Sequence, residues 1–259
     1  MRLLNSDLRK TIVNLVYSGG GGHIPSSFSI VDIINYIYAN YDVLPNQKNK
    51  AQNVFTLSKG HGACALYSVL FKFGLISENE IKSYLKYDSI LGGHPDATKI
   101  HGAEASTGSL GHGLSFTVGR ALASKIKNEN KNYFVLVGDG ECHEGTVWES
   151  AIVANNLNLN NLLCLVDYNK SSDQICPHNS LIKQFKSFGW YTIEANGHDE
   201  KSIRTSINQC LELNLRKPKC IIFNTIKGKG VSFLEGHGPW HYKIPNKEEY
   251  NKIMEELGF

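Results

Sequence analysis

The sequence predicts an α/β fold in which helices cover both faces of a doubly wound, mostly parallel sheet. Short apolar runs, such as residues 133–137 and 162–166, suit strands that are buried on both faces. Glycine-rich or polar turns end these runs, and segments with helical periodicity separate them. With 259 residues and a hydrophobic content of 41%, the chain can bury a sizeable core, and we expect one domain over residues 1–259.

Apolar spacing and turn residues place the individual elements. Helices are expected at residues 3–16, 29–41, 64–73, 77–87, 114–126, 141–155, 180–188, 201–213 and 248–257. Strands are expected at residues 53–57, 133–137, 162–166, 190–194 and 220–226. Ser29 is the expected N-cap of the second helix. Residues 90–113 lack periodicity, which in a compact domain indicates a functional or disordered loop.

Composition argues against nucleic-acid-binding and membrane proteins. Lys and Arg total 27 against 24 Asp and Glu, the formal net charge is +3, and no basic block is present. No apolar run approaches the roughly 20 residues of a membrane span, and the charged N-terminus has no leader cleavage site, so we expect a cytoplasmic protein. The six cysteines form no CxxC pair and are expected to be reduced core thiols. Cys142 could be a nucleophile, but only the adjacent His143 offers a base, so a passive role is favoured.

Asp139 and Asn169 follow two successive expected strands. A strand–helix–strand unit makes these strands parallel, so both side chains should lie at one edge of the sheet although they are 30 residues apart in sequence. A carboxylate and an amide oxygen suit Mg²⁺, or Ca²⁺ or Mn²⁺, that also holds a phosphate. Gly138 and Gly140 let a ligand approach the backbone, and the next helix directs its N-terminus there. The alternative is an ordinary Gly-Asp-Gly turn, with Asn169 as a second turn residue.

The segment GDGECHEGTVWESA, followed by Asn169 after the next strand, resembles the thiamine-diphosphate motif of the transketolase family. It is similar to the version found in the N-terminal subunits of two-chain transketolases, and implies a thiamine-diphosphate-binding domain of the diphosphate (PP) type. The resemblance implies that Asp139, Asn169 and the carbonyl of Ser171 bind the metal that anchors the diphosphate. It also implies that Glu144 lies near the cofactor and that Glu149 belongs to a carboxylate network linking paired active sites.

Four histidines fall in segments that resemble the same family. They are His23 in SGGGGHIPSSFSIVDII, His61 in LSKGHG, His94 in GGHPD and His241 in WHYKIP. The resemblance implies that His23 reaches the substrate channel and that His94 contacts the hydroxyls of the donor sugar. It implies that His61 and His241 lie beside the diphosphate, with His241 also near the transferred proton. Taken singly, each histidine could instead be an exposed turn residue.

Two other stretches complete this comparison. TGSLGHG resembles the segment whose backbone holds the aminopyrimidine, which corresponds here to Gly108, Ser109 and Leu110. Residues 171–174 depart from the family, which places apolar residues against the thiazolium ring. Asp173 changes the polarity of the pocket at this position and suggests an unusual substrate.

The resemblance implies transfer of a two-carbon ketol unit from a ketose or ketose phosphate to an aldose. Thiamine diphosphate supplies the electron sink for breaking the carbon–carbon bond, and histidines suit proton transfer near neutral pH. The family's activating glutamate lies in a pyrimidine-binding domain, which we expect on a separate C-terminal subunit in an α₂β₂ assembly. This chain alone should then transfer no ketol unit.

The sequence is also compatible with three alternative functions. The α subunit of a thiamine-dependent 2-oxoacid dehydrogenase shares the Gly-Asp-Gly and Asn motif but lacks this histidine set. A non-catalytic module that keeps half of a cofactor site is a second alternative. A nicotinamide-binding domain is the third, although GDGECHEG does not fit the GxGxxG pattern.

Overall fold

The computed structural model describes residues 5–44 and 53–259. Contacts between residues group the chain into two compact units. The helical unit comprises Met1–Asn35, Gly60–Gly108 and Ile226–Phe259, and the sheet unit comprises Tyr36–Lys59 and Ser109–Thr225. The expected single domain over residues 1–259 remains a prediction.

A five-stranded parallel sheet forms the centre of the sheet unit. Its strands are β1 (Val54–Leu57), β2 (Tyr133–Gly138), β3 (Leu162–Tyr168), β4 (Tyr191–Asn196) and β5 (Lys219–Asn224). They lie in the order β1-β2-β3-β5-β4, and Gly138 at the end of β2 is paired with Asp167 of β3. The predicted parallel α/β fold is confirmed, and the carboxyl ends of β2 and β3 are neighbours.

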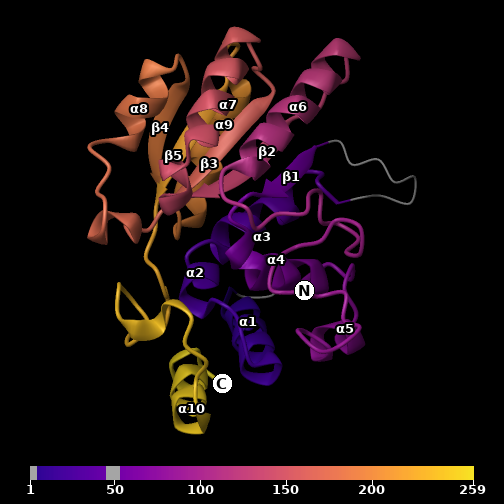
Figure 1. The fold of residues 1–259 in the computed structure, drawn as a ribbon, viewed down its shortest axis with the longest axis vertical. Helices are drawn as coiled ribbons and strands as arrows, with labels where there is room; N and C mark the ends of the chain where they lie inside the picture. Colours follow the sequence, from indigo (N-terminus) through magenta and orange to yellow (C-terminus); the bar gives the residue numbers. More distant parts are fainter. Residues whose placement is uncertain (1–4, 45–52) are drawn as a thin grey trace. The chain divides into compact units, whose positions relative to one another are not determined.

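Helices flank this sheet on both faces (Figure 1). They are α6 (His112–Ile126), α7 (Gly145–Asn156), α8 (Leu181–Ser187) and α9 (Glu200–Glu212). Val147, Ala151 and Ala154 of α7 are fully buried in the core between the sheet and the helices, as the helical spacing predicted. The apolar runs of β2 and β3 are buried along their whole length because helices cover both faces.

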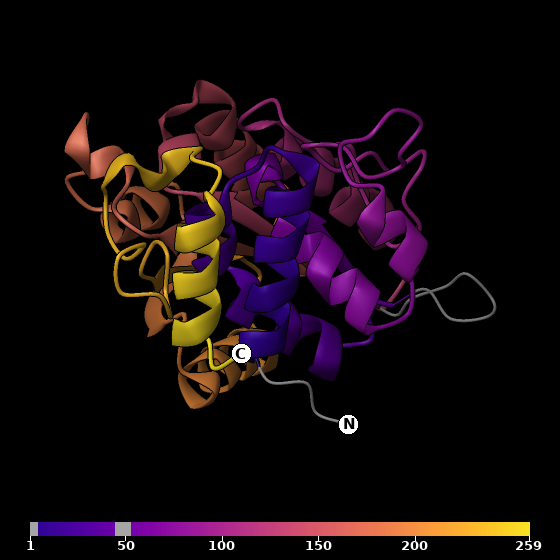
Figure 2. The ribbon, with the colours of Figure 1, turned by 90° about the horizontal axis from the view of Figure 1, so that it is seen from below.

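The helical unit is built around α1 (Asn5–Gly19). Its other helices are α2 (Ile24–Phe28), the first turns of α3 (Val31–Asn40), α4 (Ala63–Lys72), α5 (Glu78–Lys82) and α10 (Lys247–Glu256). Figure 2 shows α10 alongside α1, where the rings of Tyr17 and Tyr250 have centroids 4.4 Å apart. The buried guanidinium of Arg9 pairs with Asp32 at 2.7 Å and fixes α1 against α3.

Local geometry changes three of the expected elements. The helix expected at 29–41 is α3 (Val31–Asn40), which starts two residues later because Ser29 ends α2, and the Ser29 hydroxyl donates to the Ser26 carbonyl (2.9 Å). The helix expected at 77–87 ends at Lys82, and Leu85 has a φ of +57° that no helix accepts. The helix expected at 141–155 starts only at Gly145, after the short 3₁₀ helix Gly140–His143. Residues 3 and 4 of the first expected helix lie outside the described residues.

Candidate active site

Asp139 and Asn169 lie at the carboxyl edge of the sheet, directly after β2 and β3. The backbone N–H of Asp139 donates to the Asp167 carbonyl (3.1 Å), which joins the two strand ends. The N–H of Ser172 donates to Asp139 Oδ2 (3.3 Å), and the N–H of Ser171 donates to Asn169 Oδ1 (3.0 Å). The sheet unit therefore brings all three predicted metal-binding residues to one short stretch of this edge.

The residues at this edge fit a metal ion with a bound phosphate. Burial raises the pKa of the Asp139 carboxyl, and the neighbouring Asp167 carboxylate raises it further. The hydroxyls of Ser171 and Ser172 are buried and have no hydrogen-bond partner in the structure. A cation would compensate the buried carboxylate, and phosphate oxygens could accept from the two hydroxyls.

Such a metal ion would depend on mixed oxygen ligands. In residues 5–44 and 53–259, no three His, Cys, Asp or Glu side chains converge on one metal position. Asp139 would therefore act with the amide oxygen of Asn169 and a backbone carbonyl, a donor set that suits Mg²⁺ and Ca²⁺ better than softer metals.

A buried ion pair that the sequence motifs did not identify supports Asn169. Lys59, which follows β1, pairs with Asp167, and the two side chains are only 2% and 0% exposed. Asp167 Oδ2 also accepts from Asn169 Nδ2 (2.9 Å), and its Oδ1 accepts from the Thr225 hydroxyl. Asp167 thus orients the Asn169 amide, with its nitrogen toward the carboxylate and its oxygen toward Ser171.

Glu141 is a second buried carboxylate that sequence reasoning missed. Its Oε1 accepts from the Ser58 hydroxyl and from the Gly111 N–H (2.9 Å), and its Oε2 accepts from the Gly138 N–H (3.1 Å). Burial raises the pKa of this carboxyl, and its hydrogen bonds act in the opposite direction. Glu141 therefore joins the end of β1, the end of β2 and the start of α6. Its position directly after the Gly-Asp-Gly turn was the only sequence signal.

Of the other predicted residues of the sheet unit, Gly138 is buried and Gly140 is half-buried, whereas Ser109, Leu110, Glu144 and Glu149 are exposed. Glu144 is the extended residue that precedes α7, Glu149 lies on α7, and Ser109 and Leu110 lie just before α6. Cys142, by contrast, is buried, and burial raises its thiol pKa well above the usual range. A buried thiol of this kind is a poor nucleophile, which supports the passive role expected for Cys142.

The segment after Asn169, whose sequence departs from the family pattern, is held by hydrogen bonds of Asp173 and His178. Asp173 accepts from the Tyr168 hydroxyl (2.7 Å) and from the His178 N–H (3.2 Å). His178 Nε2 lies 2.9 Å from the Asp139 carbonyl oxygen, and its ring stacks on His143 with centroids 4.0 Å apart. No motif identified His178, because only the fold of this segment brings it to Asp139.

Three predicted histidines meet in the helical unit. His23 starts α2, His61 lies in the 3₁₀ helix Gly60–Gly62, and His241 ends the 3₁₀ helix Pro239–His241. The ring centroid of His23 is 5.0 Å from that of His61 and 5.0 Å from that of His241, and His61 and His241 are 6.3 Å apart. We call these three residues the histidine cluster.

Hydrogen bonds assign different tautomers to His23 and His241. His23 Nδ1 lies 3.0 Å from the His241 carbonyl, which can only accept, so the neutral His23 ring carries its proton on Nδ1. The Lys227 ammonium lies 3.0 Å from His241 Nδ1 and can only donate, so the neutral His241 ring carries its proton on Nε2. The cluster therefore offers a base at His23 Nε2 and a donor at His241 Nε2.

His94 is exposed and contacts the loop that contains Gly108. A Cβ on Gly108, which has a φ of +147°, would lie 3.1 Å from the His94 ring. A Cβ on Gly60 would lie 2.7 Å from the Gly108 nitrogen. The two loops touch through bare backbone at these glycines, and His94 covers the contact.

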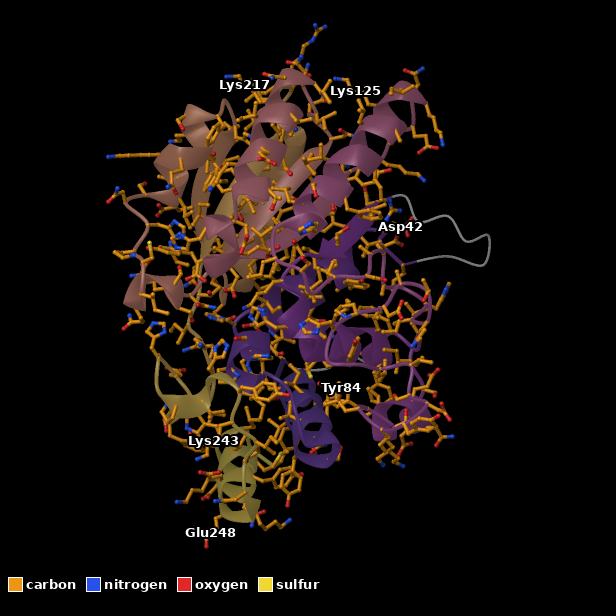
Figure 3. The ribbon with its side chains drawn as sticks, viewed as in Figure 1. Asp42, Tyr84, Lys125, Lys217, Lys243 and Glu248 are labelled. Carbon is orange, nitrogen blue, oxygen red and sulfur yellow. The ribbon has the colours of Figure 1, made fainter. Side chains whose placement is uncertain are left out.

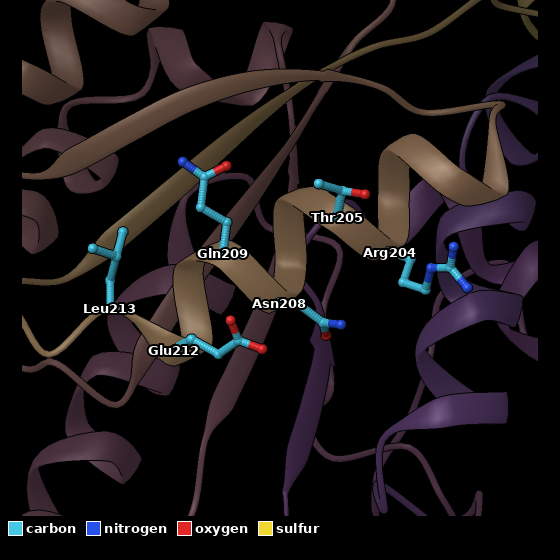
Figure 4. A pocket seen from close by; sticks show the side chains of 6 residues that line it. All are labelled: Arg204, Thr205, Asn208, Gln209, Glu212 and Leu213. Carbon is cyan, nitrogen blue, oxygen red and sulfur yellow. The ribbon is translucent and has the colours of Figure 1, made fainter.

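Two hollows in the sheet unit lie away from the predicted residues. One of about 620 Å³ is lined by α9 and the adjoining Leu213, and Figure 4 shows its six side chains. Another of about 510 Å³ lies at the amino-terminal edge of the sheet, near Lys125 at the end of α6 (Figure 3). Its Lys219 donates to the Asn160 carbonyl at 2.8 Å, and burial lowers the pKa of this amine. None of the predicted site residues lines either hollow.

The family described as "Transketolase, thiamine diphosphate binding domain" matches residues 2–259. The chain belongs to the transketolase family. The alternative of a nicotinamide-binding domain is thereby excluded, and the alternative of a 2-oxoacid dehydrogenase α subunit is not favoured. The predicted resemblance is confirmed over nearly the whole chain.

Proteins that are named as transketolase subunits are among the similar proteins. This transketolase domain is 38% identical to one subunit of the apulose-4-phosphate transketolase of Actinobacillus succinogenes, over 96% of this chain and 92% of the relative. It is 34% identical to a protein of the same name from Phocaeicola vulgatus, over 99% and 93% of the two chains. It is 32% identical to subunit SqwG of a Clostridium 6-deoxy-6-sulfo-D-fructose transketolase, over 96% and 93%.

Solved transketolases share the fold of this transketolase domain. A mutant of the Pichia stipitis enzyme and the enzyme of Campylobacter jejuni each align with a TM-score of 0.90 and 26% identity over 98% of this chain. The chain spans 40% and 42% of those two proteins, respectively. Within the described ranges, 5–44 and 53–259, no helix combines the length and apolar character that crossing a membrane requires.

Proposed function

We propose that this chain is the N-terminal subunit of a two-chain transketolase, which transfers a two-carbon ketol unit from a ketose phosphate to an aldose. The observation that carries the proposal is the near full-length similarity to proteins that are named as single subunits of transketolases. The histidine cluster supports it, and so does the grouping of Asp139, Asn169 and Ser171 at the carboxyl edge of the sheet, because both consist of the residues that the family motifs select.

The residues that the family motifs select would hold thiamine diphosphate. In the sheet unit, Asp139, Asn169 and the Ser171 carbonyl would bind Mg²⁺, with Ca²⁺ or Mn²⁺ as substitutes. In the helical unit, His61 and His241 would contact the diphosphate. When bound, thiamine diphosphate supplies the electron sink that allows a ketose carbon–carbon bond to break.

The remaining predicted residues complete this assignment. Gly138 and Gly140 would let the cofactor approach the backbone, Gly108, Ser109 and Leu110 would hold the aminopyrimidine through their backbone, and Glu144 would lie near the cofactor.

The histidines of this chain would handle the protons of the sugar. His23 Nε2 has the lone pair needed to take a proton from a hydroxyl, and His241 Nε2–H can donate one. His94 would contact donor hydroxyls from its exposed position. Because the two neutral rings carry opposite tautomers, His23 can act as the base and His241 as the acid. No proton has to be transferred between residues of this chain beforehand.

A partner subunit would supply the pyrimidine-binding domain and its activating glutamate. Large apolar side chains exposed on α6 and α7, namely Phe116, Ile152 and Val153, support a contact surface there. Glu149 lies on the same helix as two of these residues and would join the carboxylate network between paired sites. We propose an α₂β₂ assembly in the cytoplasm.

The decisive experiment is to purify this chain with its companion and to assay transfer from D-xylulose 5-phosphate to D-ribose 5-phosphate. We expect the pair to be active and the chain alone to be inactive. Asp139→Asn should abolish thiamine-diphosphate binding by the pair, whereas Asp42→Asn, an exposed control in the same unit (Figure 3), should not. Activity of the chain alone would refute the two-chain proposal, and decarboxylation of 2-oxoacids without ketol transfer would favour the dehydrogenase alternative.

The relatives suggest which donors to screen next. Apulose 4-phosphate and 6-deoxy-6-sulfo-D-fructose appear in the names of the similar subunits, and both belong in the panel beside D-fructose 6-phosphate. We propose a specialised sugar as the natural substrate, because the polar Asp173 replaces an apolar residue of the family pattern. Equal or better turnover of D-fructose 6-phosphate than of the specialised sugars would contradict this assignment.

A further inference from the structure

A fourth aromatic ring lies beside the histidine cluster. The ring centroid of Tyr242 is 4.8 Å from that of His23, which is as close as the 5.0 Å from His23 to His61 and to His241. The planes of Tyr242 and His23 are tilted by 60°. Tyr242 is therefore a direct neighbour of His23, and it brings a hydroxyl to a cluster that otherwise contains imidazoles.

The backbone on both sides of Tyr242 is fixed although its side chain is 58% exposed. The preceding Trp240 is buried, and its ring contacts Phe233 with centroids 5.5 Å apart. The following Lys243 (Figure 3) forms an ion pair with Glu249 and lies 4.3 Å from the Trp240 ring centroid. The phenol is thus presented from an anchored segment of the helical unit.

The glycine turn before His23 makes room for this phenol. A Cβ on Gly21 would lie 3.0 Å from the Tyr242 hydroxyl oxygen, closer than nearly all real contacts of a Cβ. A Cβ on Gly22 would lie 3.1 Å from the hydroxyl oxygen of the buried Tyr84. Two phenols therefore approach the bare backbone of this turn, and a side chain at Gly21 would displace Tyr242.

We propose that Tyr242 is a specificity-determining residue that contacts the ketose donor beyond its carbonyl carbon; this inference rests on the proposed function. The phenol can donate to and accept from a sugar hydroxyl, and the ring face can lie against sugar C–H groups. His23 and His61 are half-buried, whereas His241 and Tyr242 are exposed. The part of the donor that extends toward solvent therefore meets Tyr242, and the transferred two-carbon unit meets His23 and His61.

The test compares Tyr242→Phe and Tyr242→Ala in the complex with the co-purified partner. The donors are D-xylulose 5-phosphate, D-fructose 6-phosphate and β-hydroxypyruvate, which delivers a two-carbon unit but has no hydroxyl beyond its carbonyl carbon. Tyr87→Phe is the matched control, because Tyr87 is 95% exposed and lies in the same unit. Thiamine-diphosphate affinity and partner association are measured for every variant.

We expect Tyr242→Phe to lower kcat/KM about tenfold for the ketose phosphates, as loss of one hydrogen bond does, and to leave β-hydroxypyruvate unchanged. Tyr242→Ala should widen this difference, while cofactor affinity stays at the wild-type value. An equal loss of kcat/KM with all donors, no loss with any donor, or a loss explained by weaker partner association would overturn the assignment of Tyr242. None of these outcomes would overturn the proposed function. A wild-type pair that transfers from no donor would refute the proposed function, and the assignment of Tyr242 with it.

Discussion

Replacing Lys59 with methionine should destabilise the folded chain by about 3–5 kcal/mol, because it leaves Asp167 as a buried carboxylate without its cation. Lys59 and Asp167 are 2% and 0% exposed, so water cannot replace the lost ammonium. The Asn169 amide and the Thr225 hydroxyl still donate to Asp167, but both are neutral.

The intact Lys59–Asp167 ion pair adds far less to the free energy of unfolding than the removal of Lys59 takes away. At a contact distance of about 3 Å and an effective dielectric constant of about 20, the attraction amounts to roughly 5 kcal/mol. Desolvation costs several kcal/mol for each ion, so the two effects nearly cancel. Removing both charges should therefore be much less costly than removing one.

Urea unfolding at pH 7 measures both effects. The double variant Lys59→Met/Asp167→Asn should recover at least about 2 kcal/mol of the loss, since the oxygen of the introduced amide can accept from Asn169 Nδ2 and its NH2 group can donate to the Thr225 hydroxyl oxygen. Lys82→Met is the control, because Lys82 forms an ion pair with Glu78 at 2.5 Å while the two side chains are 67% and 70% exposed, and it should cause no measurable change. A Lys59→Met loss below about 1 kcal/mol, or a double variant less stable than the single one, would refute the reasoning.

Three further outcomes follow from the same structure. Gly111→Ala should lower the free energy of unfolding by at least about 1–3 kcal/mol, because its φ is +81° and a Cβ would lie 2.0 Å from Thr146 Oγ1. Gly119→Ala, at an open position in a helix, should instead raise it by up to about 1 kcal/mol. A thermal melt that ranks the two variants in the reverse order would contradict this. A native thiol titration should show only Cys176 reacting quickly, since the other five cysteines are buried and burial raises the pKa of Cys64 and Cys210 to about 12; a second fast thiol would contradict it. A chelator should release thiamine diphosphate from the reconstituted pair and Mg²⁺ should restore binding, so cofactor binding that survives chelation would argue against a metal at Asp139.

The sequence by itself determined the parallel α/β fold and the family. Apolar runs and helical spacing are local properties, and they predicted the five strands because a strand buried on both faces must be continuously apolar. The order of strand, helix and strand also predicted that the ends of β2 and β3 are neighbours, because a crossover unit makes its strands parallel. His23, His61 and His241 were predicted from motifs, which reflect relatedness to known proteins more than local physics.

Only the tertiary structure identified the side chains that support the site. Lys59 and Glu141 each bond to residues far away in sequence, so no local pattern distinguishes them from ordinary charged residues beside a strand. Ser29 had the chemistry of an N-cap, but only the structure showed that it also ends α2 and that its hydroxyl donates to the Ser26 carbonyl. The tautomer of His23 and the position of Tyr242 depend on contacts between segments more than 200 residues apart, which spacing along the chain cannot encode.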